Sequence, residues 1–124
     1  MSSVAFCVPV RAGKLPDALK LADAITSNMA EGHDETHRAH GVRRVKIYHQ
    51  KRPNEAVIIY IEADDIRAAM RNRAASEHEF DDWFAKMIED ITGYHPDLHF
   101  HEPPSEILID WHEQHGHKHR AEHT

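Results

Sequence analysis

The chain has 124 residues, which suffices for one domain with its own core and is too short for two. Its formal charge of −6, with 29% charged and 40% hydrophobic residues, indicates a globular protein and argues against a nucleic-acid partner, whose phosphates attract basic surfaces. No apolar run reaches the roughly 20 residues of a membrane helix. The first residues lack the basic region and apolar stretch that we would expect of a signal peptide, and the single cysteine, Cys7, excludes an internal disulfide. We therefore expect a cytoplasmic protein with no membrane partner.

The first expected element is a strand over residues 3–10, where Val4, Phe6 and Val8 alternate with Ala5 and Cys7. This pattern predicts a strand with Cys7 as a small buried side chain.

A long helix is expected next, from about Leu15 to His40, with Gly41 ending it. Its apolar residues recur every three or four positions, which places them on one face. They are Leu15, Ala18, Leu19, Ala22, Ile25 and Met29. His33, His37 and His40 continue the same line, so the helix face that packs on the core ends in imidazoles.

Two strands and a hairpin loop follow. Residues 42–50 alternate, residues 51–54 form the loop, and residues 56–61 are apolar on both faces. A strand that is apolar on both faces is buried on both, which predicts that the third strand is central in the sheet.

A second helix is expected from a cap at Asp64, with a break near residues 74–76. Ser76 and Glu79 then form a capping box that opens a further helical stretch, which Gly93 ends. The inward side chains expected along these helices are Ile66, Ala69, Met70, Phe80, Trp83, Phe84, Met87, Ile88 and Ile91.

A last strand is expected over residues 106–111, which gives the order β-α-β-β-α-β. This is the ferredoxin-like arrangement, an α+β fold with a four-stranded antiparallel sheet and both helices on one face. The domain spans residues 1–111, and the histidine-rich residues 112–124 form a tail that we expect to be flexible and to chelate metal weakly. Because the other sheet face has no cover, we expect a homodimer in which two sheets face each other.

Several segments carry a resemblance to a known family. They are residues 10–14, 57–65, 80–84 and 103–111. In these segments the chain resembles the dimeric α+β barrel superfamily, and within it a group of small, largely uncharacterised bacterial proteins. The resemblance implies a pocket between the sheet and the helices of one subunit. Relatives there include cofactor-independent monooxygenases, muconolactone-type isomerases, sugar mutarotases, polyketide cyclases and haem enzymes.

His33 and His37 are the first candidate site residues, because side chains four apart on a helix project together. They can line a pocket and move a proton, or they can bind a divalent transition metal with a third ligand such as His78. The structural alternative is that both are hydrogen-bonded core groups. In haem-binding relatives a histidine on the second helix ligates iron, but His78 lies beside the apolar stripe, so haem is disfavoured.

Tyr60, Tyr48 and His49 lie on the central strands and can line the pocket, with Tyr60 favoured to orient a substrate. Trp83 is a further pocket candidate, although its place in an apolar stripe is typical of a core residue. The sequence contains no nucleophile elbow, glycine-rich phosphate loop, paired-cysteine zinc motif or dinucleotide fingerprint. Three hypotheses remain: a small-molecule enzyme, a metalloprotein, and a dimer without chemistry.

Overall fold

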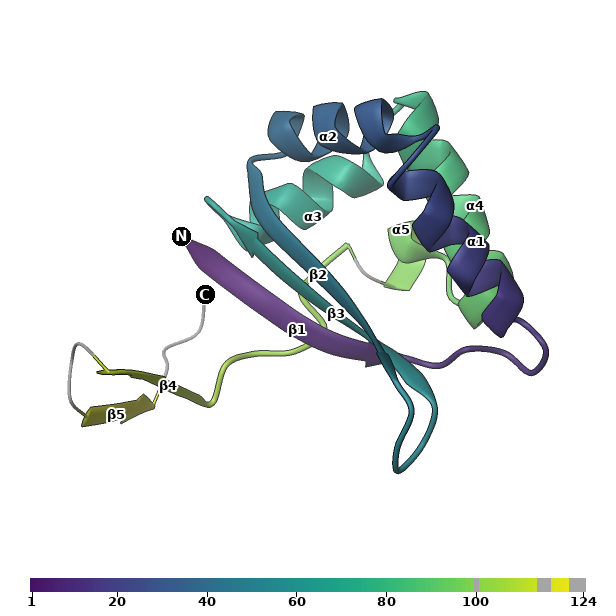
Figure 1. The fold of residues 1–124 in the computed structure, drawn as a ribbon. Coiled ribbons are helices and arrows are strands. Elements are labelled where there is room, and N and C mark those ends of the chain that lie inside the picture. Colours follow the sequence, from purple (N-terminus) through teal and green to yellow (C-terminus); the bar gives the residue numbers. More distant parts are fainter. Residues whose placement is uncertain (100, 114–116, 121–124) are drawn as a thin grey trace.

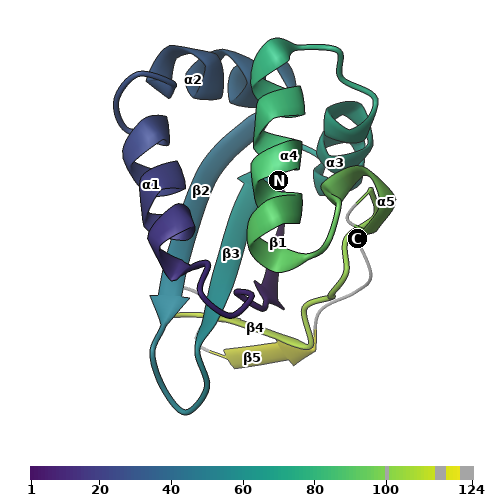
Figure 2. The same ribbon diagram turned by 90° about the vertical axis from the view of Figure 1, so that its right-hand side faces the viewer.

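A computed structural model describes residues 1–99, 101–113 and 117–120. An antiparallel sheet of β1 (Ser2–Val8), β2 (Val42–Gln50) and β3 (Ala56–Ala63) has its helices on one face (Figures 1 and 2). The strand order is β1-β3-β2, which confirms that the third strand is central.

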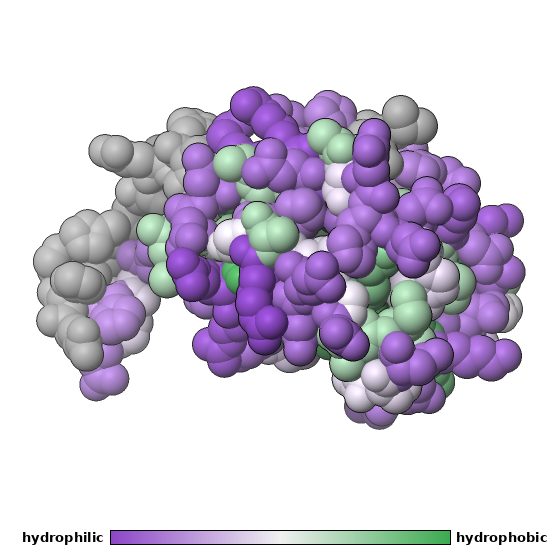
Figure 3. Space-filling model, turned by 90° about the horizontal axis from the view of Figure 1, so that it is seen from above, coloured by the Kyte–Doolittle hydropathy of each residue, from purple (hydrophilic) through white to green (hydrophobic). Residues whose placement is uncertain are grey.

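The helices cover a single face of this sheet, and the surface that they present from above is mainly hydrophilic (Figure 3). They are α1 (Leu15–Ile25), α2 (Ala30–Ala39), α3 (Ile66–Ala74), α4 (Glu79–Thr92) and the short α5 (Pro96–His99). None of the helices in the described ranges has the length and apolar character needed to span a membrane.

The expected single helix from Leu15 to His40 is two helices, so that prediction was wrong. At the junction two side-chain hydroxyls donate to main-chain carbonyls, and the Ser27 N–H pairs with the Ala24 carbonyl at 3.2 Å instead of the Asp23 carbonyl four residues back. The Thr26 hydroxyl donates to the Ala22 carbonyl at 3.0 Å, and the Ser27 hydroxyl donates to the Asp23 carbonyl at 2.6 Å. α2 therefore starts again at Ala30 and runs in a different direction from α1 (Figure 1).

The cap of α3 is Asp65 and not Asp64. The Asp65 carboxylate accepts the Ala68 N–H at 3.2 Å, whereas Asp64 pairs with Arg43 at 2.9 Å. The helix ends at Ala74, which confirms the expected break.

The cap of α4 also differs from the expected Ser76. His78 Nδ1 accepts the Phe80 N–H at 3.0 Å, and Ser76 Oγ accepts the His78 N–H at 3.1 Å instead of capping the helix. Gly93 ends α4 in the left-handed region at φ 83°, as expected.

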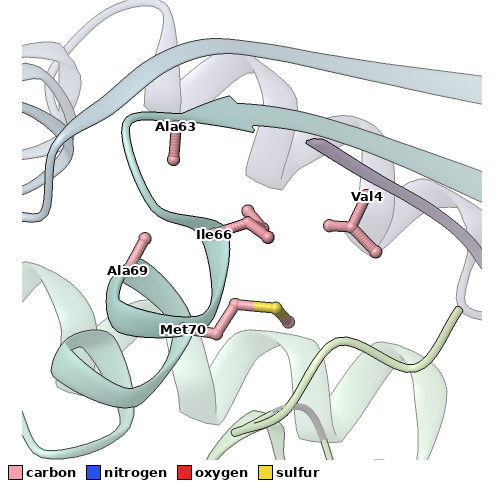
Figure 4. Close-up of a cluster of buried hydrophobic side chains, with 5 residues drawn as sticks. All are labelled: Val4, Ala63, Ile66, Ala69 and Met70. Atoms are coloured by element: carbon pink, nitrogen blue, oxygen red, sulfur yellow. The ribbon is translucent and has the colours of Figure 1, made fainter. Parts of the chain in front are cut away.

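The core has two clusters. One joins β1, β3 and α3 through Val4, Ala63, Ile66, Ala69 and Met70 (Figure 4). The other joins α1 to α4 through Leu21, Ile88 and Ile91. Leu21 replaces Leu19 as the buried leucine of α1, because Leu19 is 54% exposed.

The expected fourth strand of the sheet lies elsewhere. β4 (Ile109–His112) pairs with β5 (His117–Arg120) as a separate hairpin on the side of the sheet away from the helices (Figures 1 and 2). Pro103 and Pro104 have no N–H to donate to the edge of β1, and Ser105 contacts that edge through its hydroxyl, which donates to the Ala5 carbonyl.

β5 falls in the tail that we expected to be flexible. Residues 114–116 and 121–124 of that tail lie outside the described residues.

Candidate functional site

A cavity of about 110 Å³ lies between the sheet and the helices. Its apolar walls come from both layers, with Phe6, Val8, Val45, Ile47, Ile59 and Ile61 on the sheet side. Polar side chains also line it: His33, His37, His40, Arg73 and Asp81. A mostly apolar cavity with a few polar groups is the usual form of a small-molecule site.

A second cavity of about 180 Å³ adjoins the first, between α1 and the sheet. The two cavities have six lining residues in common: Val8, Ile25, Ile47, Ile59, Phe84 and Ile88. Since an apolar cavity of about 150 Å³ holds benzene, the second cavity has room for a ring of that size.

His33 and His37 are stacked one helical turn apart on α2. Their ring centroids are 3.9 Å apart with an interplanar angle of 28°. The Phe80 ring meets His33 edge-on, with the centroids 5.7 Å apart. Gly32 allows this approach of α2 to α4, because a Cβ there would lie 3.2 Å from the Phe80 Cβ.

The proton on His37 is fixed by a main-chain contact. His37 Nδ1 lies 2.6 Å from the His33 carbonyl oxygen, which can only accept, so Nδ1 donates and Nε2 keeps its lone pair. Burial is the main cause that lowers the pKa of His37 below its usual 6.5, and the neighbouring His33 adds to it. The main-chain bond and Asp81 oppose this shift in the pKa. His37 is therefore a neutral base at pH 7.

His40 and Asp81 form a buried pair beside these rings. His40 Nε2 lies 2.9 Å from Asp81 Oδ2, and their side chains are 14% and 6% exposed. Sequence reasoning placed His40 on the stripe of α2 but gave it no role in the site. Asp81 was missed because an acidic residue in the first turn of a helix is common without any ligand.

A surface groove of about 250 Å³ also has the two stacked rings in its lining. Its lining residues are His33, Asp34, His37, Arg38, Val42, Arg43, Arg44 and Val45. His33, His37, Val42 and Val45 line both the groove and the first cavity. The charge of Arg43 is offset by its ion pair with Asp64, at 2.9 Å.

The candidate residues on the strands, Tyr60, Tyr48 and His49, do not line the first cavity. Ile59 and Ile61 line the first cavity, so the alternation of β3 places Tyr60 on the outer sheet face. There the Tyr60 hydroxyl donates to Glu62 at 2.6 Å, and this bond raises the pKa of Tyr60. Tyr48 is 51% exposed, and both Tyr48 and His49 line the second cavity.

His78 and Trp83 do not line the first cavity. The Nδ1 of His78 is used in capping α4, and its Nε2 lies 3.6 Å from Glu35. Trp83 packs against Phe80, with the ring centroids 5.7 Å apart. Cys7, which we expected to be buried, is exposed on the outer sheet face.

The part of the chain that the structure describes contains no group of three or more His, Cys, Asp or Glu side chains placed to hold a metal ion. His33 and His37 do come together as expected, but His78 does not join them in the cavity lining.

The chain was compared with known proteins at three levels. No model of a protein family, no curated protein and no solved structure matches it. The resemblance to the dimeric α+β barrel superfamily therefore stays a prediction.

Proposed function

We propose that the protein is a small-molecule enzyme that moves a proton in the cavity between sheet and helices, with His37 as the base. The observation that carries this proposal is the state of His37, a neutral ring whose proton is held on Nδ1 by the His33 carbonyl. Its remaining nitrogen is the basic one, and the ring lines a largely apolar cavity. A base with a lowered pKa in such a cavity is a recurrent feature of catalytic sites.

The reaction class that fits is proton abstraction from a carbon or oxygen acid. His37 Nε2 takes the proton, and the bond electrons stay on the substrate as an enolate or another anion. Asp81 favours the protonated ring electrostatically. The same ring then returns the proton at another position, which gives an isomerisation of the kind that the sequence resemblance implies.

The mostly apolar residues that line the two cavities indicate the class of substrate. The adjoining second cavity accepts an apolar body of about the size of a benzene ring. We infer a small, largely apolar organic molecule whose acidic C–H or O–H bond lies against His37. His33 is a positioning residue, because its carbonyl fixes the tautomer of His37.

The fold supports this proposal. The sheet order β1-β3-β2 and helices on a single face fit a ferredoxin-like, dimeric α+β barrel protein whose cavity lies between these layers. The same proposal places the protein in the cytoplasm, where its single thiol, Cys7, would stay reduced.

The test uses 5-nitrobenzisoxazole, a small apolar carbon acid whose ring opens when a base removes one proton. We expect saturable ring opening by the wild type, and a loss of about tenfold or more in kcat/KM in His37→Gln. The matched control is His101→Gln, which removes an exposed imidazole outside the cavity.

The pH profile separates this proposal from general imidazole catalysis. The rate should fall at acidic pH as His37 becomes protonated, and this limb should be absent in His37→Gln. Ring opening that does not saturate, or that His37→Gln leaves unchanged, would refute the proposal.

A further inference from the structure

His40 is a largely buried titratable residue of the first cavity to which the proposed reaction gives no step. Its Nε2 lies 2.9 Å from Oδ2 of Asp81, whose side chain is 6% exposed. Because an ionised carboxylate can only accept hydrogen bonds, Nε2 carries the proton of this contact. The basic nitrogen of the neutral His40 ring is therefore Nδ1.

The Nδ1 atom of His40 is left for another partner. Within residues 1–99, 101–113 and 117–120 it forms no hydrogen bond, and the ring that carries it lines the cavity. A carboxylate bonded to one nitrogen of an imidazole orients the ring and stabilises the charge that the ring takes up with a second proton. His40 and Asp81 therefore form a pair that can give a proton to a ligand and take it back.

His37 and His40 are placed to act on one molecule. They are three residues apart near the end of α2, and side chains at that spacing share a helix face with Cβ atoms about 5–6 Å apart. Both rings line the first cavity. His37 is the neutral base, because burial lowers its pKa, whereas His40 has a carboxylate to balance a positive charge. Two titratable groups in such different surroundings are typical of a base and an acid that act together.

We propose that His40 is the catalytic acid of the reaction, and that the substrate is a small carbonyl compound. This rests on the proposed function, in which His37 is the base. The carbonyl oxygen of the substrate lies against His40 Nδ1, and a C–H bond of the adjacent carbon lies against His37 Nε2. Asp81 is a positioning residue that holds the His40 ring in this orientation.

The proton transfers balance between the two rings. His37 Nε2 takes the proton from the carbon next to the carbonyl group, and the C–H electrons form a C=C bond. The electrons of the C=O π bond take the Nδ1 proton of the His40 imidazolium, so the substrate becomes an enol. The His37 imidazolium then gives its proton to another carbon, while the enol O–H returns its proton to His40. A β,γ-unsaturated ketone becomes its conjugated isomer in this way, and both rings recover their initial states.

The test uses 3-cyclohexen-1-one, a ketone whose ring is close in size to the benzene that fits the second cavity. Its product, 2-cyclohexen-1-one, is followed by the ultraviolet absorption of the conjugated carbonyl group. We expect saturable isomerisation by the wild type and a loss of about a hundredfold in kcat in His40→Gln. Ring opening of 5-nitrobenzisoxazole releases a phenolate that is stable without an acid, so the same variant should lose only about fivefold or less there.

His78→Gln is the matched control. It removes a half-buried imidazole that also lies between α2 and α4, but outside the first cavity. Both of its rates should stay close to those of the wild type. Asp81→Asn is a second variant that keeps the His40 ring, and it should lower isomerisation by about tenfold and ring opening by less. It carries the same test if circular dichroism shows that His40→Gln is unfolded.

Phenol gives a readout that does not depend on turnover, because it is planar and carries a hydroxyl group like the dienol of the substrate. The wild type should bind phenol about tenfold or more tightly than toluene, and His40→Gln should lose this preference. Equal losses of both activities in His40→Gln, or a phenol preference that survives in it, would overturn the proposal. A wild type that opens 5-nitrobenzisoxazole but leaves the ketone unchanged would overturn the role of His40 alone. A wild type without ring opening would refute the proposed function, and this proposal with it.

Discussion

His40 and Asp81 join α2 to α4 through a bond of 2.9 Å between Nε2 and Oδ2. The bond connects α2, which carries His33 and His37, to α4, which carries Phe80. The Phe80 ring contacts both histidine rings. Asp81 is 6% exposed in its side chain, so the pair is largely shielded from water. A hydrogen bond to a charged group that is shielded from water contributes more to the free energy of unfolding than an exposed ion pair does.

Replacing Asp81 by Asn keeps the volume and one acceptor, but it removes the charge from this bond. We expect Asp81→Asn to lower the free energy of unfolding by about 1–2 kcal/mol, measured by urea denaturation. Asp82→Asn is the control, since Asp82 is in the same turn and forms an exposed pair with Lys86 at 3.0 Å. Its loss should be about 0.5 kcal/mol or less. Equal losses in the two variants would contradict a special role for the buried pair.

Acid should destabilise the protein through His37. Its pKa is lowered in the folded state by burial first and by His33 second. As the pH falls below the unfolded value of about 6.5, the unfolded chain therefore takes up the proton first. The stability linked to His37 is fully present above that pH and is lost below it.

The measurement is urea denaturation between pH 5 and pH 7.5. The wild type should lose more stability over this range than His37→Gln, whose amide can still donate to the His33 carbonyl. A direct readout is the NMR titration of the His37 ring protons, with a midpoint below 6.5. Identical pH dependence in the two proteins would contradict the assigned state of His37.

Sequence periodicity was sufficient for the central strand β3 and for the faces of α3 and α4. Ile66, Ala69 and Met70 are buried as the spacing predicted. The helix break at Thr26 and Ser27 was not visible in that spacing, because both residues lie off the apolar stripe, between Ile25 and Met29, and neither is Gly or Pro.

Part of the site followed from the sequence and part did not. The spacing of His33 and His37 is sufficient to place them together on one helix. The contact of His40 with Asp81 joins residues 41 apart, so it depends on how α2 packs against α4. Tyr60 was assigned to the cavity because its strand is apolar on both faces, a pattern that does not say which face meets the helices.

The cluster around α3 should be sensitive to truncation. Ile66 is 1% exposed and packs with Val4 and Met70 (Figure 4). We expect Ile66→Ala to cost about 2–5 kcal/mol of unfolding free energy, from lost burial and from the cavity that it leaves. Leu19→Ala, at a position that is 54% exposed, should change it by about 0.5 kcal/mol or less. Similar effects of the two truncations would contradict the assigned core.

Gly32 tests the packing of the helix that carries the site. It lies inside α2, where Ala is favoured over Gly by about 1 kcal/mol when nothing opposes the added methyl group. Here the new Cβ would lie 3.2 Å from the Phe80 Cβ and 3.3 Å from its Cδ2, and the Phe80 Cβ is attached directly to the main chain of α4. We therefore expect Gly32→Ala to lower the unfolding free energy by about 1–2 kcal/mol, despite the higher helix propensity of Ala.

Glu31→Ala is the control for this prediction. It lies at the neighbouring exposed position and should have little effect on the unfolding free energy. The displacement of α2 should also shift the His37 ring signals in NMR spectra, whereas a stabilised Gly32→Ala protein with unchanged His37 signals would show that the two helices are not in tight contact.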